Sequence, residues 1–128
     1  MLSLGDTHAA QGHGELAGTA LESPMRVCLK IELLKNASVP GQWFSSQGPL
    51  ARHLDGKGYY VTCGVSAVLM DAARSAASHM IDLLARHHQL NPIDAYILCS
   101  VCGDLVISEM VNTPVHVVSL YFPRIVFE

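Results

Sequence analysis

Strict alternation of apolar and polar residues marks the first predicted strand of the chain. In residues 26–33, every second position is apolar and the intervening positions are mostly charged: Val27, Leu29, Ile31 and Leu33 alternate with Arg26, Cys28, Lys30 and Glu32. A period of two predicts a half-buried strand with a wet outer face. Residues 59–63 have strand composition and precede Gly64, so a second strand is expected there.

A period of three and four residues replaces this alternation in the middle of the chain. Apolar residues recur with that spacing at Val65, Leu69, Ala72, Ala73, Ala76, Met80, Leu83 and Leu84. This pattern predicts an amphipathic helix that runs to about His88, and Ser66 is expected to cap it. Part of the apolar face consists of alanines, and because their side chains are short, another element can approach the helix closely.

A second helix is predicted after the pair Asn91 and Pro92. Asparagine is a favoured N-cap, proline suits the first helical position, and Asp94 complements the helix dipole. This helix should end near Gly103. Residues 105–111 and 115–122 have strand composition, and both faces of the latter are largely apolar, as in a buried strand. Strands, two helices and further strands together indicate an α+β fold.

Composition limits the class of protein. A chain of 128 residues fits a single domain over 1–128, and 50% hydrophobic with 15% charged residues excludes disorder. The net charge of −3 and scattered basic residues argue against nucleic acid as a partner. We expect no membrane span, because the most apolar stretch, 93–107, contains two aspartates and is too short. The mean hydropathy of +0.30 indicates a large core or an apolar surface that meets a partner.

Cysteine usage and the N-terminus point to a cytoplasmic protein. The first residues lack the basic and apolar regions of a signal peptide. Four cysteines in apolar settings are then expected to be reduced thiols. The pair Cys99 and Cys102 has the spacing of a redox or zinc motif, but it has no second pair and lies at the end of an apolar helix. Two buried structural cysteines are the favoured interpretation.

Chemistry-bearing side chains concentrate in the first 24 residues, between glycines. They are Asp6, His8, Gln11, His13, Glu15 and Glu22. In an extended backbone, Asp6 and His8 lie on the same side, so both can grip one divalent cation. Gly12 and Gly14 allow a reversal that returns Glu15 to the same point.

Carboxylate and imidazole donors suit zinc or another divalent ion, and a free carboxylate can then act as general base. The alternative is a hydrogen-bonded, glycine-rich loop without a metal. Spacing alone favours that plainer interpretation, because short strings of this kind are common.

Several strings resemble the acetamidase/formamidase family of amide hydrolases. Residues 4–15, LGDTHAAQGHGE, are similar to the family signature Gly-Asp-x-His-Ala-x-x-Gly-x-Gly-Glu, and residues 18–22, GTALE, continue it. Residues 71–74, 80–82, 94–96 and 103–108 are similar to the family's C-terminal helices and following strand. The chain resembles only the C-terminal portion of longer members. It departs from them at His13, where aspartate is usual, and at Val106, where a basic residue is common.

This resemblance implies a β-sandwich-like core with two helices in the C-terminal half, and a divalent metal, zinc before calcium. The implied activity is hydrolysis of short linear amides, formamide or acetamide, to carboxylate and ammonia. We assign Asp6, His8 and Glu15 as catalytic, with Glu15 as general base and later proton donor to ammonia. Gln11 and Glu22 are candidate substrate-binding groups, and Asp6, His8 and His13 are candidate metal ligands.

The sequence therefore supports two hypotheses about the function of the chain. The first is a cytoplasmic amidohydrolase, expected to be a homo-oligomer. The second is a non-catalytic structural or interaction fragment of the same fold, favoured by the high hydrophobicity for this length.

Overall fold

The computed structural model describes residues 5–33, 35–36, 45, 56–111 and 113–128. Two short strands, β1 (His8–Ala10) and β2 (Leu21–Glu22), precede β3 (Tyr59–Ser66). Helices α1 (Leu69–His88) and α2 (Pro92–Cys102) follow, then β4 (Asp104–Glu109) and β5 (His116–Pro123), and a 3-10 turn over Arg124–Phe127 ends the chain. The predicted α+β fold is confirmed.

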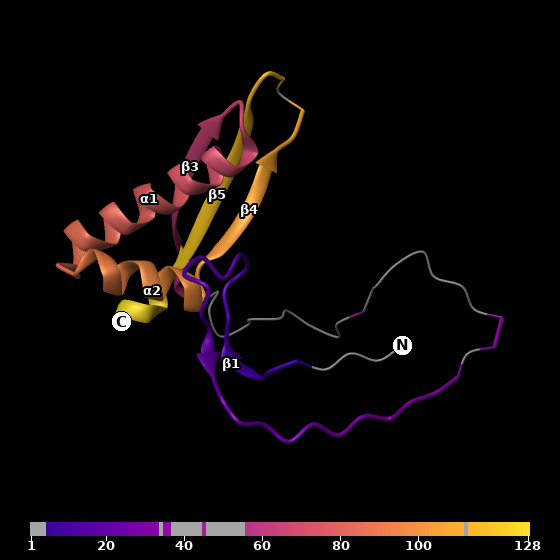
Figure 1. Cartoon of the computed structure of the whole chain (residues 1–128). Helices are drawn as coiled ribbons and strands as arrows, with labels where there is room; N and C mark the ends of the chain where they lie inside the picture. Colours follow the sequence, from indigo (N-terminus) through magenta and orange to yellow (C-terminus); the bar gives the residue numbers. More distant parts are fainter. Residues whose placement is uncertain (1–4, 34, 37–44, 46–55, 112) are drawn as a thin grey trace.

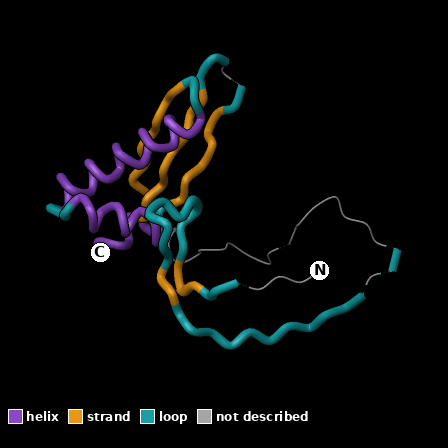
Figure 2. The backbone as a smooth tube through the Cα atoms, viewed as in Figure 1, coloured by secondary structure: helices purple, strands orange, loops and turns teal. Residues whose placement is uncertain are grey.

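Three antiparallel strands in the order β3-β5-β4 form the main sheet, and α1 covers one of its faces (Figure 1). In the register of this sheet, Ser119 of β5 lies between Cys63 of β3 and Val106 of β4. Figure 2 shows α2 beside α1 at one end of the sheet. The fully buried side chains between sheet and helices include Met80, Leu84, Cys99, Val118, Leu120 and Phe122.

Helix α1 lies unusually close to β3, as its thin alanine face predicts. A Cβ added at Gly64 would stand 2.0 Å from the carbonyl oxygen of Ala72. Thr62 donates a hydrogen bond from its side chain to the carbonyl of Ala76 at 2.8 Å. Glycine and alanine are therefore needed here because the two backbones come within contact distance.

Helix boundaries agree with the sequence except at one cap. The predicted capping role of Ser66 is wrong, because Val68 is the N-cap of α1, and Ser66 Oγ instead accepts the N–H of Val68 at 3.2 Å. The helix ends at His88 as expected. Asn91 caps α2 as predicted, its side-chain oxygen accepting the N–H of Ile93 at 2.9 Å.

The second face of the main sheet is open within the described residues. Val61 and Val65 of β3 and Val106 of β4 project from it and are 44%, 59% and 42% exposed. Where the sequence led us to expect a sandwich-like core, the main sheet packs, in the described ranges, against helices on one side only (Figure 1).

The strand predicted for residues 26–33 is wrong. These residues are extended away from the sheet, lie in no strand, and are all exposed (Figure 1). The long connection predicted for 36–58 falls mostly outside the described residues. In the part of the chain that the structure describes, no helix has the length and apolar character needed to cross a membrane.

Candidate functional site

The N-terminal hairpin brings together residues that are far apart in the sequence. Strands β1 and β2 pair antiparallel, with His8 directly opposite Glu22. Directly opposed residues of an antiparallel pair project from the same face. Asp6 lies two residues before His8 and so reaches the same side.

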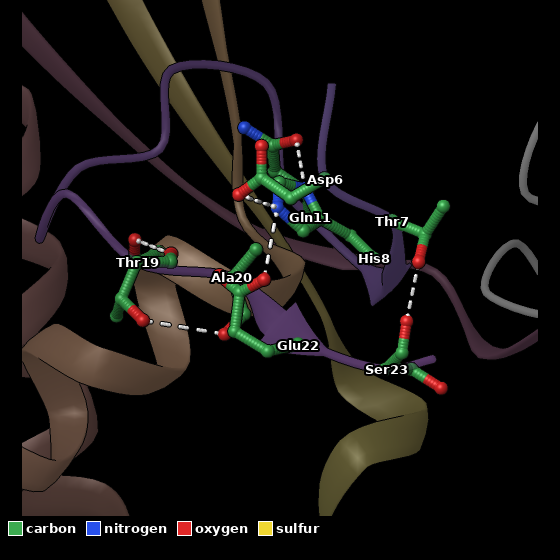
Figure 3. Close-up of polar contacts among 9 residues, drawn as sticks. Asp6, Thr7, His8, Gln11, Thr19, Ala20, Glu22 and Ser23 are labelled. Carbon is green, nitrogen blue, oxygen red and sulfur yellow. Dashed lines mark hydrogen bonds and ion pairs between the residues drawn. The ribbon is translucent and has the colours of Figure 1, made fainter. Parts of the chain in front are cut away.

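Asp6, His8 and Glu22, which we call the carboxylate–histidine trio, converge on one point (Figure 3). His8 Nε2 lies 3.4 Å from Asp6 Oδ2 and 3.2 Å from Glu22 Oε2. The other ring nitrogen, Nδ1, lies 2.9 Å from Gln11 Oε1. One ligand atom from each member of the trio lies within 4.8 Å of the others.

Electrostatics in the trio favour a protonated imidazole when no cation is bound. The hydrogen bond to Gln11 raises the pKa of His8 above its usual 6.5, with help from both carboxylates and against the cost of desolvation. A hydrogen bond from its own backbone, followed by the contacts with His8, lowers the pKa of Asp6. The side chain of His8 is 20% exposed, whereas Asp6 and Glu22 are 81% and 59% exposed. Both carboxylates therefore remain open to solvent.

Ser100 of α2 holds the connection between the two hairpin strands. Its buried hydroxyl accepts the N–H of Ala17 at 3.0 Å and donates to the carbonyl of Thr19 at 2.6 Å. Its own carbonyl accepts the N–H of Gly12 at 3.1 Å. A Cβ on Gly12 would stand 2.0 Å from the carbonyl oxygen of Gly103. The motif glycine thus lets the hairpin rest directly on the end of α2.

His13 and Glu15 are not part of the trio. The backbone of His13 is bonded to the start of β4: its carbonyl accepts the N–H of Leu105 at 2.7 Å, and its N–H donates to the side-chain carboxylate of Asp104 at 2.9 Å. Its side chain lines a shallow pocket with Asp104, Tyr59 and Tyr121. Glu15 is partly buried in the hairpin connection at a φ of 41°. The roles assigned to these two residues stay predictions.

Glu22 is the member of the trio that sequence spacing did not assign as a metal ligand. It follows His8 by 14 residues, and only the β1–β2 pairing places the two opposite each other. The available signal is the short apolar-polar string at 20–22 after Gly18, which favours a return strand.

The trio's chemistry fits a divalent cation. One imidazole nitrogen and two carboxylate oxygens are donor types that zinc accepts, and three protein ligands is the number found in catalytic zinc sites, which leave a further position open. Gln11 supplies a partner for the second ring nitrogen, as usually found for ligating histidines. The described residues therefore form an α+β protein with a candidate cation site on a hairpin.

The pair Cys99 and Cys102 offers little competing metal or redox chemistry. All four cysteines, Cys28, Cys63, Cys99 and Cys102, are free. Burial raises the pKa of Cys99 and of Cys102 to about 12. Because zinc binding and thiol exchange both need the thiolate, this environment supports a structural role for the pair.

Comparison with known proteins gives the family. The sequence profile of the Acetamidase/Formamidase family matches residues 1–128, so this chain belongs to that family. A solved structure of a gamma lactamase from Delftia acidovorans is similar to it in fold, with a TM-score of 0.51 and 22% identity. The match covers 55% of this chain and 19% of the lactamase chain. No curated protein matches. The family resemblance seen in the sequence is thereby confirmed.

Proposed function

We propose that this chain acts in the hydrolysis of carbon–nitrogen bonds of short linear amides, formamide or acetamide, with a divalent cation at the trio. The observation that carries the proposal is the convergence of Asp6, His8 and Glu22 within 4.8 Å. Family membership over residues 1–128 supports amide hydrolysis as the reaction class. Small-molecule amides, rather than nucleic acid or a membrane, are the proposed partners.

Zinc is the proposed cation. Calcium prefers six to eight oxygen ligands, whereas zinc accepts a mixed set of nitrogen and oxygen donors. Asp6, His8 and Glu22 would hold it. His8 is suited to this because Gln11 takes the proton of Nδ1 and leaves Nε2 toward the carboxylates. When bound, the ion would supply a Lewis acid for the amide carbonyl.

The reaction also needs proton transfer, because an amide nitrogen is a poor leaving group. We propose Glu15 as the base that removes a proton from water and then passes it to the departing ammonia. Glu15 lies in the connection between the two strands that carry His8 and Glu22. Gln11 keeps its proposed contact with substrate in addition to orienting His8, and His13 stays a proposed metal ligand.

Ammonia release from formamide and acetamide by the purified chain, with and without added zinc, tests this function. We expect release that depends on zinc and that falls to background in Asp6→Ala, His8→Ala and Glu22→Gln. Asp82→Asn is the matched control, because Asp82 is an exposed carboxylate that pairs with Arg86 on α1. A folded chain with no release at any zinc concentration would reject the proposal.

The second candidate is a non-catalytic interaction fragment. The open sheet face and the exposed residues 25–33 favour it, as does the 19% coverage of the lactamase chain. Stoichiometric zinc without ammonia release would support this candidate over the first.

A further inference from the structure

Cross-strand register gathers two tyrosines and a carboxylate on the open face of the main sheet. Asp104 of β4 lies directly opposite Tyr121 of β5, and Tyr121 lies directly opposite Val61 of β3. Directly opposed residues of an antiparallel pair project from the same face, with their Cβ atoms about 5 Å apart. Tyr59 precedes Val61 by two residues and therefore projects from this face as well.

These side chains line a shallow pocket, which we call the tyrosine pocket. It has a volume of about 340 Å³, and Val106 and His13 complete its lining with Tyr59, Tyr121 and Asp104. The two tyrosine rings are nearly perpendicular, at 81°, and their centroids are 6.1 Å apart. Tyr121 is 36% exposed, so part of its side chain is accessible to a ligand.

The carboxylate of Asp104 is the acidic group of the tyrosine pocket. One of its oxygens accepts the backbone N–H of His13 at 2.9 Å. Asp104 is partly buried and forms no ion pair with any residue that the structure describes, and the pocket lining contains neither lysine nor arginine. A partly buried carboxylate without a cationic partner attracts a bound cation and repels an anion.

The tyrosine rings select the kind of cation. The face of an aromatic ring carries the negative part of its quadrupole and attracts a cation within about 6 Å of its centroid. Carbon atoms make up most of these walls, whereas metal ions need several oxygen, nitrogen or sulfur ligands. An organic ammonium ion, whose charge is surrounded by methyl or methylene groups, gains from the rings and from the carboxylate together.

We propose that the tyrosine pocket binds a small organic ammonium ion, with Asp104 as its counter-ion and the rings of Tyr59 and Tyr121 against its alkyl groups. Val106 adds an apolar wall on the side of β4. No member of the carboxylate–histidine trio lines this pocket, so the proposal does not depend on the proposed amide hydrolysis.

Two probes of the same shape test whether the charge governs binding. Choline carries a trimethylammonium group, and in its uncharged carbon isostere a tert-butyl group replaces it. Each probe is titrated into the isotopically labelled chain at about pH 8, where imidazole side chains are ordinarily neutral, and followed by NMR. We expect choline to give saturable shifts centred on the tyrosine pocket, with a Kd on the order of 1 mM. The uncharged isostere should bind roughly fivefold more weakly or not at all.

Two variants remove the two attractions separately. Asp104→Asn removes the charge and keeps an oxygen that can accept the N–H of His13, and Tyr121→Leu removes one ring and keeps apolar surface. Each should weaken choline binding roughly two- to fivefold, as loss of an exposed ion pair or cation–π contact does, whereas Tyr121→Phe should bind like the parent chain. Asp71→Asn is the matched control, because Asp71 is an exposed carboxylate that pairs with Arg74 outside the pocket.

Several results would overturn the proposal. They are equal binding of choline and its uncharged isostere, shifts centred on the trio instead of the tyrosine pocket, and parent-like binding in either Asp104→Asn or a folded Tyr121→Leu. Absence of saturation at about 50 mM choline, roughly fifty times a Kd of 1 mM, would also overturn it. If circular dichroism shows that Tyr121→Leu does not fold, Asp104→Asn decides the question, because the hydrogen bond to His13 is retained.

Discussion

Single residues decide whether the β1–β2 hairpin can bind a cation. His8 is the least exposed member of the trio and is the only one that contacts both of the others. Its pairing with Asp6 follows from the two-residue spacing and was predictable from sequence. Its contact with Glu22 depends on strand register, which local sequence does not encode for strands of two and three residues.

The protonation of His8 should control cation binding. Its pKa is raised above 6.5, chiefly by the bond to Gln11, so protons compete with zinc to higher pH than at an ordinary histidine. Zinc affinity should keep rising with pH above 6.5. In the metal-free protein, the stability contributed by protonated His8 is complete below the unfolded pKa and is lost as pH rises through the folded one.

An NMR titration of the metal-free chain checks this directly. Gln11→Ala should lower the pKa of His8, because it removes the largest cause of the shift. His79 is an internal reference, since its Nδ1 bonds to the carbonyl of Cys63, far from Gln11 in the fold. An unchanged His8 pKa in the variant would contradict the assignment.

Gly12 should be the least replaceable glycine of the motif. A Cβ there meets the backbone of Gly103 at 2.0 Å, and backbone cannot move aside as a flexible side chain can. We expect Gly12→Ala to lower the free energy of unfolding by about 1–3 kcal/mol, as overpacking does. Urea unfolding measures this. Gly5→Ala is the control, since a Cβ on Gly5 meets nothing within 4 Å, and an equal loss in both variants would refute the packing argument.

At the scale of elements, periodicity predicted the helices well and the first strand badly. Helices α1 and α2 satisfy their backbone hydrogen bonds internally, so a local pattern is enough to place them. A strand needs a partner from elsewhere in the chain or from another chain. The alternation at 26–33 is genuine, but the described residues offer it no pairing strand, and it remains exposed.

The N-cap of α2, which the sequence predicted correctly, should contribute measurably to the free energy of unfolding. Asn91 accepts the N–H of Ile93 at 2.9 Å, and Pro92 occupies the first helical turn. Asn91→Ala should reduce the free energy of unfolding by about 1 kcal/mol, as loss of an N-cap does. Thermal unfolding followed by circular dichroism measures the loss, and Asn91→Asp should restore most of it. If Asp and Ala destabilise equally, the side-chain cap contributes nothing.

At the scale of the whole molecule, the candidate site depends on a helix that contributes none of its ligands. Ser100 of α2 bonds to Ala17 and Thr19 through its hydroxyl and to Gly12 through its carbonyl. Tyr96, one turn earlier, donates from its hydroxyl to the carbonyl of Leu16. These bonds tie the hairpin connection to the core, and the register of β1 with β2 depends on that connection.

Ser100→Ala should therefore weaken zinc binding without touching a ligand. The variant leaves the N–H of Ala17 and the carbonyl of Thr19 without their partner, which costs about 1–3 kcal/mol for buried groups. Amide hydrogen exchange should accelerate across residues 8–22, and calorimetry should show a lower zinc affinity. The matched control for this prediction is Ser119→Ala.

Ser119 is also buried, and its hydroxyl is hydrogen-bonded to Cys63 and Ser108, but it lies within the main sheet. Both variants should lose stability, and only Ser100→Ala should loosen the hairpin. If Ser100→Ala and Ser119→Ala lower the zinc affinity equally, zinc binding depends only on the overall stability of the protein, and α2 has no particular role in holding the site.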